Sequence, residues 1–173
     1  MMGAPTAFRS ERLAMTTTRP ESLAFLDLAP VRAEATRELD ASPEAVFDAL
    51  ADAGGWPRWF PNMQECRWLT PPPHGVDSQR EVRVGPLHVV ERFIVWERPR
   101  RWGFTFTAAT PPIARAGAEL VELEGIGDGG TRATYTMAVE PPAPAGLATL
   151  ASGPMEATLA EALTSLDHYL ARR

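Results

Sequence analysis

Two polar residues that flank a tight turn are the first candidates for chemistry in this sequence. Arg80 and Glu91 lie on either side of Gly85-Pro86, where glycine followed by proline suits a two-residue type II′ turn. Such a turn places Arg80 opposite Glu91 on a face otherwise made of valines. With the hydroxyl of Tyr135 on the same face, the pair could bind a ligand by hydrogen bonds and transfer protons. The alternative is a structural ion pair near the end of the sheet, because ion-pair networks often exist without catalysis.

A second turn predicts how the next two strands pair. The sequence ERPR at residues 97–100 pairs Val95 with Trp102 and Phe93 with Phe104. Both turns select the same apolar face, and a slip of one residue would invert every side chain. Their agreement therefore predicts an antiparallel meander with one apolar and one polar face.

The first 30 residues are expected to form a leader that is partly mobile. Its beginning is polar and Thr-rich and has no periodicity, which predicts mobility. The segment Ser22–Ala29 is more apolar and is expected to dock on the domain. It would cover Ile94 and Trp96, which do not fit the polar face, unless a bulge turns these two residues inward.

The elements after the leader follow the order strand, two short helices, six strands and a long helix. The alternating sequence VRAEATREL at residues 31–39 predicts the first strand. Leucines at steps of three and four between Met155 and Leu170 predict an amphipathic terminal helix. Leu147 and Leu150 suggest a short helical piece before it. These patterns predict one α+β domain over residues 31–173, in which a seven-stranded antiparallel sheet is covered by the long helix.

The connection after the first helix is unusually aromatic. Gly54-Gly55 ends that helix, and Trp56, Trp59 and Phe60 follow with the spacing i, i+3 and i+4. A second short helix would place all three rings on one side. They either plug one end of the core, which is the commoner use of such residues, or form the wall of a binding site.

Composition and motifs exclude several classes of function. The net charge of −5 argues against nucleic acid as a partner. A single cysteine and no long apolar run predict a cytoplasmic protein without a transmembrane segment. The bias towards arginine, with no lysine, fits a GC-rich bacterial genome. No metal-ligand spacing appears, and Gly125, Gly127 and Gly130 precede a strand rather than a helix, so neither a metal nor a cofactor is expected.

Several sequence segments, in their order along the chain, resemble the SRPBCC, or START-like, superfamily, and within it the polyketide cyclase/dehydrase-like branch. They are ASPEAVFDALAD after the first strand, then WPRWFP, ERFIVWERPRRWGFTF and GDGGTRATYTMAVEPP before the terminal helix. The resemblance covers about residues 31–173. It implies a helix-grip fold, in which the curved sheet holds the long helix around an internal cavity for an apolar ligand.

The resemblance implies a protein that binds a hydrophobic or amphipathic small molecule, such as a lipid, quinone or polyketide-like compound. The expected lining residues lie on the shared apolar face, on the covering helix or in the aromatic connection. They are Trp59, Phe60, Val82, Phe93, Phe104, Phe106, Tyr135, Met137, Met155 and Leu159.

Two other classes of function remain open. One is an aromatase/cyclase or dehydratase acting on a polyketide-type substrate, with Arg80, Glu91 and Tyr135 as candidate catalytic residues. The other is a protein-interaction module, which would show a collapsed cavity and an exposed apolar patch. The protein is expected to be a monomer or a homodimer.

Overall fold

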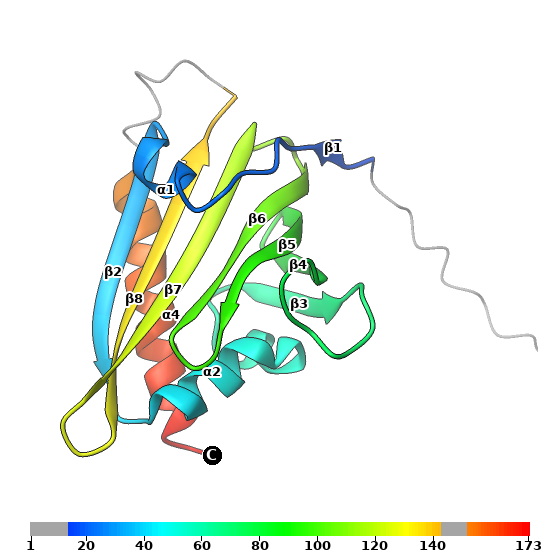
Figure 1. The fold of residues 1–173 in the computed structure, drawn as a ribbon. Coiled ribbons are helices and arrows are strands. Elements are labelled where there is room, and N and C mark those ends of the chain that lie inside the picture. Colours follow the sequence, from blue (N-terminus) through cyan, green and yellow to red (C-terminus); the bar gives the residue numbers. More distant parts are fainter. Residues whose placement is uncertain (1–13, 143–151) are drawn as a thin grey trace, which may run out of the picture.

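The computed structural model describes residues 14–142 and 152–173 of the chain (Figure 1). The helices are α1 (Phe25–Leu28), α2 (Pro43–Ala51), the 3-10 helix η1 (Ala53–Arg58) and α4 (Ser152–Leu170). The strands are β1 (Thr16–Thr17), β2 (Val31–Leu39), β3 (Met63–Trp68), β4 (Gln79–Val84), β5 (Leu87–Glu97), β6 (Arg101–Thr110), β7 (Ala116–Ile126) and β8 (Gly130–Glu140). Residues 1–13 and the helical piece expected at Leu147 and Leu150 lie outside the described residues. None of the helices described is both long and apolar enough to span a membrane.

The predicted fold class is confirmed. The strands form an antiparallel sheet in the order β2-β8-β7-β6-β5-β4-β3, and α4 packs mainly on β2 and also on β8 (Figure 1). Leu159, Leu163 and Leu166 of α4 are buried on this concave side, as the leucine spacing predicted. Burial of this apolar stripe is what holds the helix on the sheet, since a sheet with one apolar face needs a second layer.

The β4–β5 hairpin has the predicted register. Gly85 adopts a φ of 55°, the left-handed conformation that the first central position of a type II′ turn requires. Val84 pairs with Leu87, and Arg80 with Glu91. Local turn chemistry therefore places both charged residues side by side before any long-range contact is considered.

A bulge changes the β5–β6 pairing after Phe93. Phe93 pairs with Phe104 as predicted, but the register then shifts, and Trp96 rather than Val95 lies opposite Trp102. The prediction for Val95 is wrong because an extra residue reverses the alternation of faces. Trp96 consequently turns towards the concave core, where its ring packs edge-on against Phe93 at 5.0 Å between centroids.

The leader covers the convex face of the sheet. Phe25 and Leu26 of α1 are buried in a small apolar cluster, the convex cluster, on the side of the sheet away from α4 (Figure 1). Its other members are Val95, Ala116, Ala118, Leu120 and Ala138, with Leu23 and Ala29 at its edge. The bulge thus supplies Val95 to the leader and Trp96 to the core. The bulge explanation holds for Trp96, whereas the cluster under the leader includes neither Ile94 nor Trp96.

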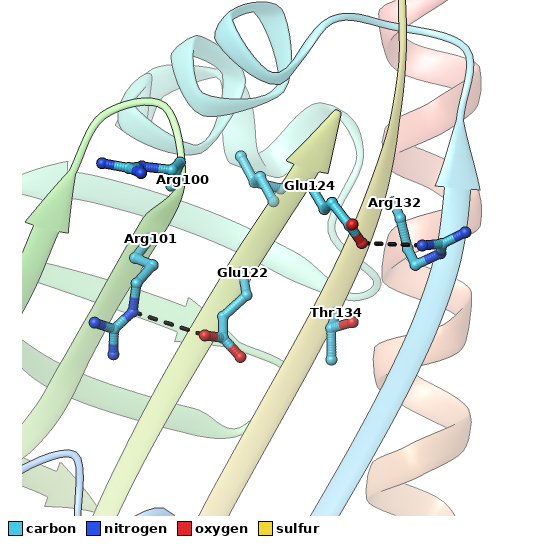
Figure 2. Close-up of a pocket in the computed structure, with 7 residues that line it drawn as sticks. Arg100, Arg101, Glu122, Glu124, Arg132 and Thr134 are labelled. Atoms are coloured by element: carbon cyan, nitrogen blue, oxygen red, sulfur yellow. Dashed lines mark hydrogen bonds and ion pairs between the residues drawn. The ribbon is translucent and has the colours of Figure 1, made fainter. Parts of the chain in front are cut away.

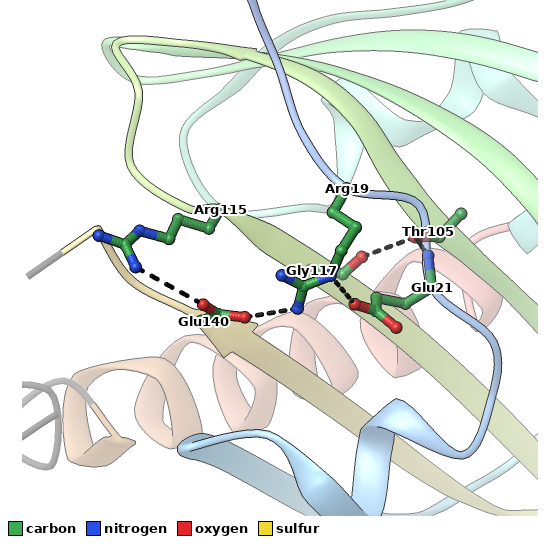
Figure 3. A network of polar contacts seen from close by, with 6 residues as sticks. All are labelled: Arg19, Glu21, Thr105, Arg115, Gly117 and Glu140. Atoms are coloured by element: carbon green, nitrogen blue, oxygen red, sulfur yellow. Dashed lines mark hydrogen bonds and ion pairs between the residues drawn. The ribbon is translucent and has the colours of Figure 1, made fainter.

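Part of the leader expected to be mobile is bound to the sheet. Thr16 and Thr17 of β1 pair with Ala109 and Ala108 of β6, which adds a short eighth strand. Beyond this strand, the Arg19 amide donates to the Arg115 carbonyl at 2.8 Å. Polar contacts continue the attachment, because the Arg19 side chain reaches Glu21 at 2.6 Å and Glu140 at 2.5 Å (Figure 3).

The burial of α1 predicts that the leader contributes to stability. Phe25→Ala is expected to lower the free energy of unfolding by about 3–5 kcal/mol, because it removes a ring that is only 7% exposed. Leu28→Ala is the matched control, since Leu28 lies on the same helix and is 79% exposed. Urea unfolding of both variants measures the difference. Equal stability of the two would mean that the leader rests on the sheet without stabilising it.

Candidate functional site

Four polar residues lie within the apolar concave interior. Arg80, Glu91, Glu119 and Tyr135 project from β4, β5, β7 and β8, and each is at most 5% exposed. The Arg80 Nε donates to Glu91, and the Tyr135 hydroxyl donates to Glu119. We call these four residues the polar centre. Buried charges of this kind persist only when they are paired and hydrogen-bonded.

Aromatic rings surround the guanidinium of Arg80. Its central carbon lies 4.3 Å from the centroid of the Trp56 ring, 4.7 Å from that of Trp102 and 5.0 Å from that of Phe104. The Phe93 ring lies slightly farther away, at 5.4 Å. The electron-rich faces of these rings attract the cation and replace part of its lost hydration. The rings therefore help Arg80 to remain charged in the interior.

Burial shifts the pKa of each acid in the polar centre upward. It raises the pKa of Glu119 from 4.5 to about 8, and the negative charge of Glu91 adds to the rise. Burial also raises the pKa of Glu91, although Arg80 opposes this, and it raises that of Tyr135 well above its usual value. Glu119 is therefore protonated at neutral pH and can donate a proton there.

The pairing between Arg80 and Glu91 was predicted from sequence, whereas the partner of Tyr135 was not. Glu119 was overlooked, although it alternates with Val121 and so belongs to the apolar face of its strand. Trp56 and Trp102 were recognised as apolar residues but not as neighbours of Arg80. No local pattern relates Trp56 to Arg80, because the two lie on separate elements.

The residues predicted to line a cavity belong to one continuous apolar cluster. Phe60, Met137 and Met155 are half-buried at its margin, and the remaining seven are buried. Those seven are Trp59, Val82, Phe93, Phe104, Phe106, Tyr135 and Leu159. Phe106 packs closely on Gly117, where an added Cβ would come within 2.2 Å of the ring.

The aromatic connection also meets this cluster. Its rings contact one another, with centroids 4.3 Å apart for Trp56 and Trp59 and 5.4 Å apart for Trp56 and Phe60. Trp56 also stacks on Trp102 of β6 at 5.5 Å. The connection therefore places Trp59 and Phe60 beside the rings that surround Arg80.

A hollow of about 370 Å³ lies on the convex face (Figure 2). Its walls carry alternating charges, with Arg132 2.9 Å from Glu124 and Arg101 3.7 Å from Glu122. Because these side chains are partly exposed and paired, the hollow offers little to an apolar ligand. Within the described residues, no group of three His, Cys, Asp or Glu side chains is placed to hold a metal.

Cys66 is not activated by its position. Burial raises the pKa of its thiol from 9.0 to about 11, and the nearby charge of Arg80 only partly opposes this. The thiol therefore stays protonated at neutral pH, which does not suit a nucleophile.

Comparisons with known proteins agree with this architecture. A family model described as polyketide cyclase/dehydrase and lipid transport matches residues 30–171. An uncharacterised protein of Mycobacterium tuberculosis (strain H37Rv) is 36% identical over 124 residues, which cover 71% of this chain and 74% of that protein.

Solved structures share the fold at low sequence identity. A START superfamily protein from Mycobacterium smegmatis has a TM-score of 0.69 and 19% identity, and the match covers 80% of this chain and 98% of that one. The Zhui aromatase/cyclase from Streptomyces sp. R1128 has a TM-score of 0.67 and 19% identity, with 82% and 94% covered. At this identity the likeness concerns the fold alone.

Proposed function

Because the chain belongs to the polyketide cyclase/dehydrase and lipid transport family, we propose that it binds a hydrophobic or amphipathic small molecule between the concave face of the sheet and α4. A lipid, a quinone or a polyketide-like compound fits this description. The START-like resemblance seen in the sequence has the same implication, and the family match confirms that resemblance.

The observation that carries the proposal is the polar centre inside an apolar core. Replacing a buried ion pair by apolar residues of similar size is often neutral or stabilising, so stability alone is a weak reason to keep one. Here Arg80 and Glu91 are 1% and 4% exposed, and a second hydrogen-bonded pair lies on the same face. Convergent polar groups within an apolar region are typical of small-molecule sites.

We assign the ten predicted lining residues to the binding site. Tyr135 supplies a hydroxyl, while Phe93, Phe104 and Phe106 supply aromatic surface. The half-buried Met137 and Met155 form the entrance, because they lie where the apolar cluster reaches solvent. The other members are Trp59, Phe60, Val82 and Leu159. Methionine suits such a position, since its flexible thioether adapts to different ligands.

A larger side chain at the proposed site should reduce ligand binding. We expect wild-type protein to bind the fluorescent fatty acid cis-parinaric acid saturably, and Met137→Trp to weaken that binding at least several-fold. Thr134→Trp is the control, since Thr134 lies on the same strand but lines the hollow on the convex face. Fluorescence titration measures both dissociation constants. If wild-type protein does not bind the fatty acid, or if both variants behave alike, the concave side is a filled core.

A second candidate function is a cyclase or dehydratase, which the protonation of Glu119 favours. Loss of water from a β-hydroxy ketone breaks the α C–H bond and the C–O bond of the hydroxyl, so a base must take the α proton and an acid must protonate the leaving hydroxyl. The carboxylate of Glu91 is the base that the polar centre offers. A carboxylic acid with a pKa of about 8, hydrogen-bonded to Tyr135, is such an acid at neutral pH.

Dehydration of 4-hydroxy-4-phenylbutan-2-one tests this second function. Wild-type protein should accelerate the reaction over buffer, and the rate should fall above pH 8 as Glu119 loses its proton. Glu119→Gln should lower the rate by about 10²–10⁴, the usual contribution of an acid catalyst. Glu122→Gln, on the opposite face of β7, should retain it. A rate equal to that in buffer would leave binding as the function.

A further inference from the structure

Several buried hydrogen-bond donors in the concave interior have no acceptor. They are Nη1 of Arg80, the indole nitrogens of Trp59 and Trp102, and the hydroxyl of Tyr169, none of which has a hydrogen-bond partner among the described residues. All four residues are more than nine-tenths buried, with exposures of 1%, 5%, 0% and 7%. A buried donor without a partner costs free energy, so each one requires an explanation.

Most of the side chains that carry these donors pack around one ring. The Trp56 ring lies 4.3 Å from that of Trp59, 5.5 Å from that of Trp102 and 4.3 Å from the guanidinium carbon of Arg80. The Tyr169 hydroxyl lies beside the preceding residue, since a Cβ added at Gly55 would be 3.1 Å from it. Trp56 itself is satisfied, because its indole donates to the Leu50 carbonyl at 2.9 Å. The unsatisfied atoms therefore belong to the surroundings of Trp56 and not to that residue.

The chemistry of the unsatisfied atoms selects the ligand's polar group. Indole and guanidinium nitrogens only donate hydrogen bonds, so the missing partner must be an acceptor. The charge of Arg80 is already balanced by Glu91. Glu119 has a pKa of about 8 and is therefore neutral at pH 7. A carboxylate or phosphate placed beside these donors would add an unbalanced negative charge there, which is unfavourable, whereas the carboxylate of a fatty acid can remain at the proposed entrance beside Met137 and Met155. A neutral oxygen acceptor would satisfy the donors without that cost.

We infer that the ligand of the proposed binding site is a neutral, conjugated carbonyl compound whose oxygen accepts a hydrogen bond from the indole nitrogen of Trp102 or Trp59. The inference rests on the proposed function, since it names the class of molecule that the concave interior binds. The aromatic rings around Trp56 would stack on the conjugated part of the molecule. The oxygen would take the place of the missing acceptor.

Three naphthalene compounds of similar size test this inference by equilibrium dialysis. 2-Acetylnaphthalene carries the neutral carbonyl, 2-ethylnaphthalene carries no acceptor and 2-naphthoate carries a charge. We expect the ketone to bind more tightly than either of the others. The expected advantage over 2-ethylnaphthalene is about two- to tenfold for one hydrogen bond.

Removal of single donors locates the contact. Trp102→Phe and Trp59→Phe each delete an indole nitrogen but retain an aromatic ring, and at least one should abolish the preference for the ketone over 2-ethylnaphthalene. Trp68→Phe is the matched control, because Trp68 packs on the same core cluster but is not among the buried donors without a partner. The ratio of the two affinities cancels any general loss of packing, since both compounds occupy the same space.

The outcomes separate this inference from the proposed function. If 2-ethylnaphthalene binds as tightly as the ketone, or if 2-naphthoate binds best, the inference is wrong while small-molecule binding stands. A preference that survives in both tryptophan variants also overturns it, as does a failure of all three compounds in protein that binds cis-parinaric acid. If neither the naphthalenes nor the fatty acid bind, the proposed function fails with it.

Discussion

Arg80→Met is expected to lower the free energy of unfolding by about 3–5 kcal/mol, the usual cost of breaking a buried ion pair from one side. The substitution leaves the carboxylate of Glu91 in an interior where it is only 4% exposed and without its cation. It also removes the group on which four aromatic rings pack. Urea unfolding at neutral pH measures the loss.

The double variant distinguishes pairing from packing. Glu91→Leu alone should also destabilise the protein, whereas Arg80→Met with Glu91→Leu should recover part of the combined loss, because no unpaired charge remains. Arg92→Met is the matched control, since Arg92 is the neighbour of Glu91 on the opposite face and its ion pair with Asp77 is partly exposed. That variant should change stability by no more than about 0.5 kcal/mol. Strictly additive effects of the two core substitutions would show that Arg80 and Glu91 do not interact in solution.

Glu119→Gln is expected to stabilise the protein increasingly as the pH rises from 4.5 towards 8. The folded-state pKa of Glu119 is about 8, above the value of 4.5 for a free side chain, so the folded protein binds one more proton than the unfolded chain in this range. Stability contributed by this proton is complete below pH 4.5 and is lost as the pH rises, by at most about 1.4 kcal/mol per pH unit. Glutamine keeps an acceptor for Tyr135 and does not ionise, so it avoids the loss.

Urea unfolding at pH 5.5, 7.0 and 8.5 tests this linkage. The difference in stability between Glu119→Gln and wild-type protein should grow by several kcal/mol over the series and then level off. Glu122→Gln provides the control, because the Glu122 side chain lies on the opposite face of the same strand and is 54% exposed. Its difference from wild type should be nearly independent of pH. A constant difference for Glu119→Gln would mean that the carboxyl is ionised throughout, and it would remove the acid from the dehydratase candidate.

The two predictions concern different halves of the polar centre. Arg80 and Glu91 test whether the interior contains a coupled charge pair, and Glu119 tests whether it contains a neutral acid. If both results are as expected, the interior is close to electrically neutral at pH 7. That neutrality is the condition on which the preference for a neutral carbonyl ligand depends.

Turn chemistry and alternation determined the β4–β5 hairpin from the sequence alone. The two-residue turn requires a positive φ at its first position, which Gly85 adopts without strain, and the short turn leaves one register for Arg80 and Glu91. The terminal helix α4 was equally predictable, because leucines at helical spacing form one apolar stripe that must be buried. The family resemblance agreed with this arrangement of helix on sheet and added the expectation of an internal cavity, which local patterns do not specify.

Interactions between distant segments decided the rest of the candidate site. The bulge after Phe93 depends on how β5 packs against both the leader and the core, so alternation alone assigned Val95 to the wrong face. The attachment of β1 to β6 likewise required the folded sheet, since a strand of two residues is too short to show an alternating pattern. Neither segment contains the partner that fixes its conformation.

The surroundings of Arg80 show the same limit most clearly. The sequence determined that Arg80 meets Glu91, because eleven positions and one turn separate them. Only the tertiary structure brings Trp56 and Trp102 onto its guanidinium and Tyr135 onto Glu119, since these residues lie on different elements. The pKa of Glu119 follows from that assembly, because desolvation arises when the whole interior closes around a side chain and not from its neighbours in sequence.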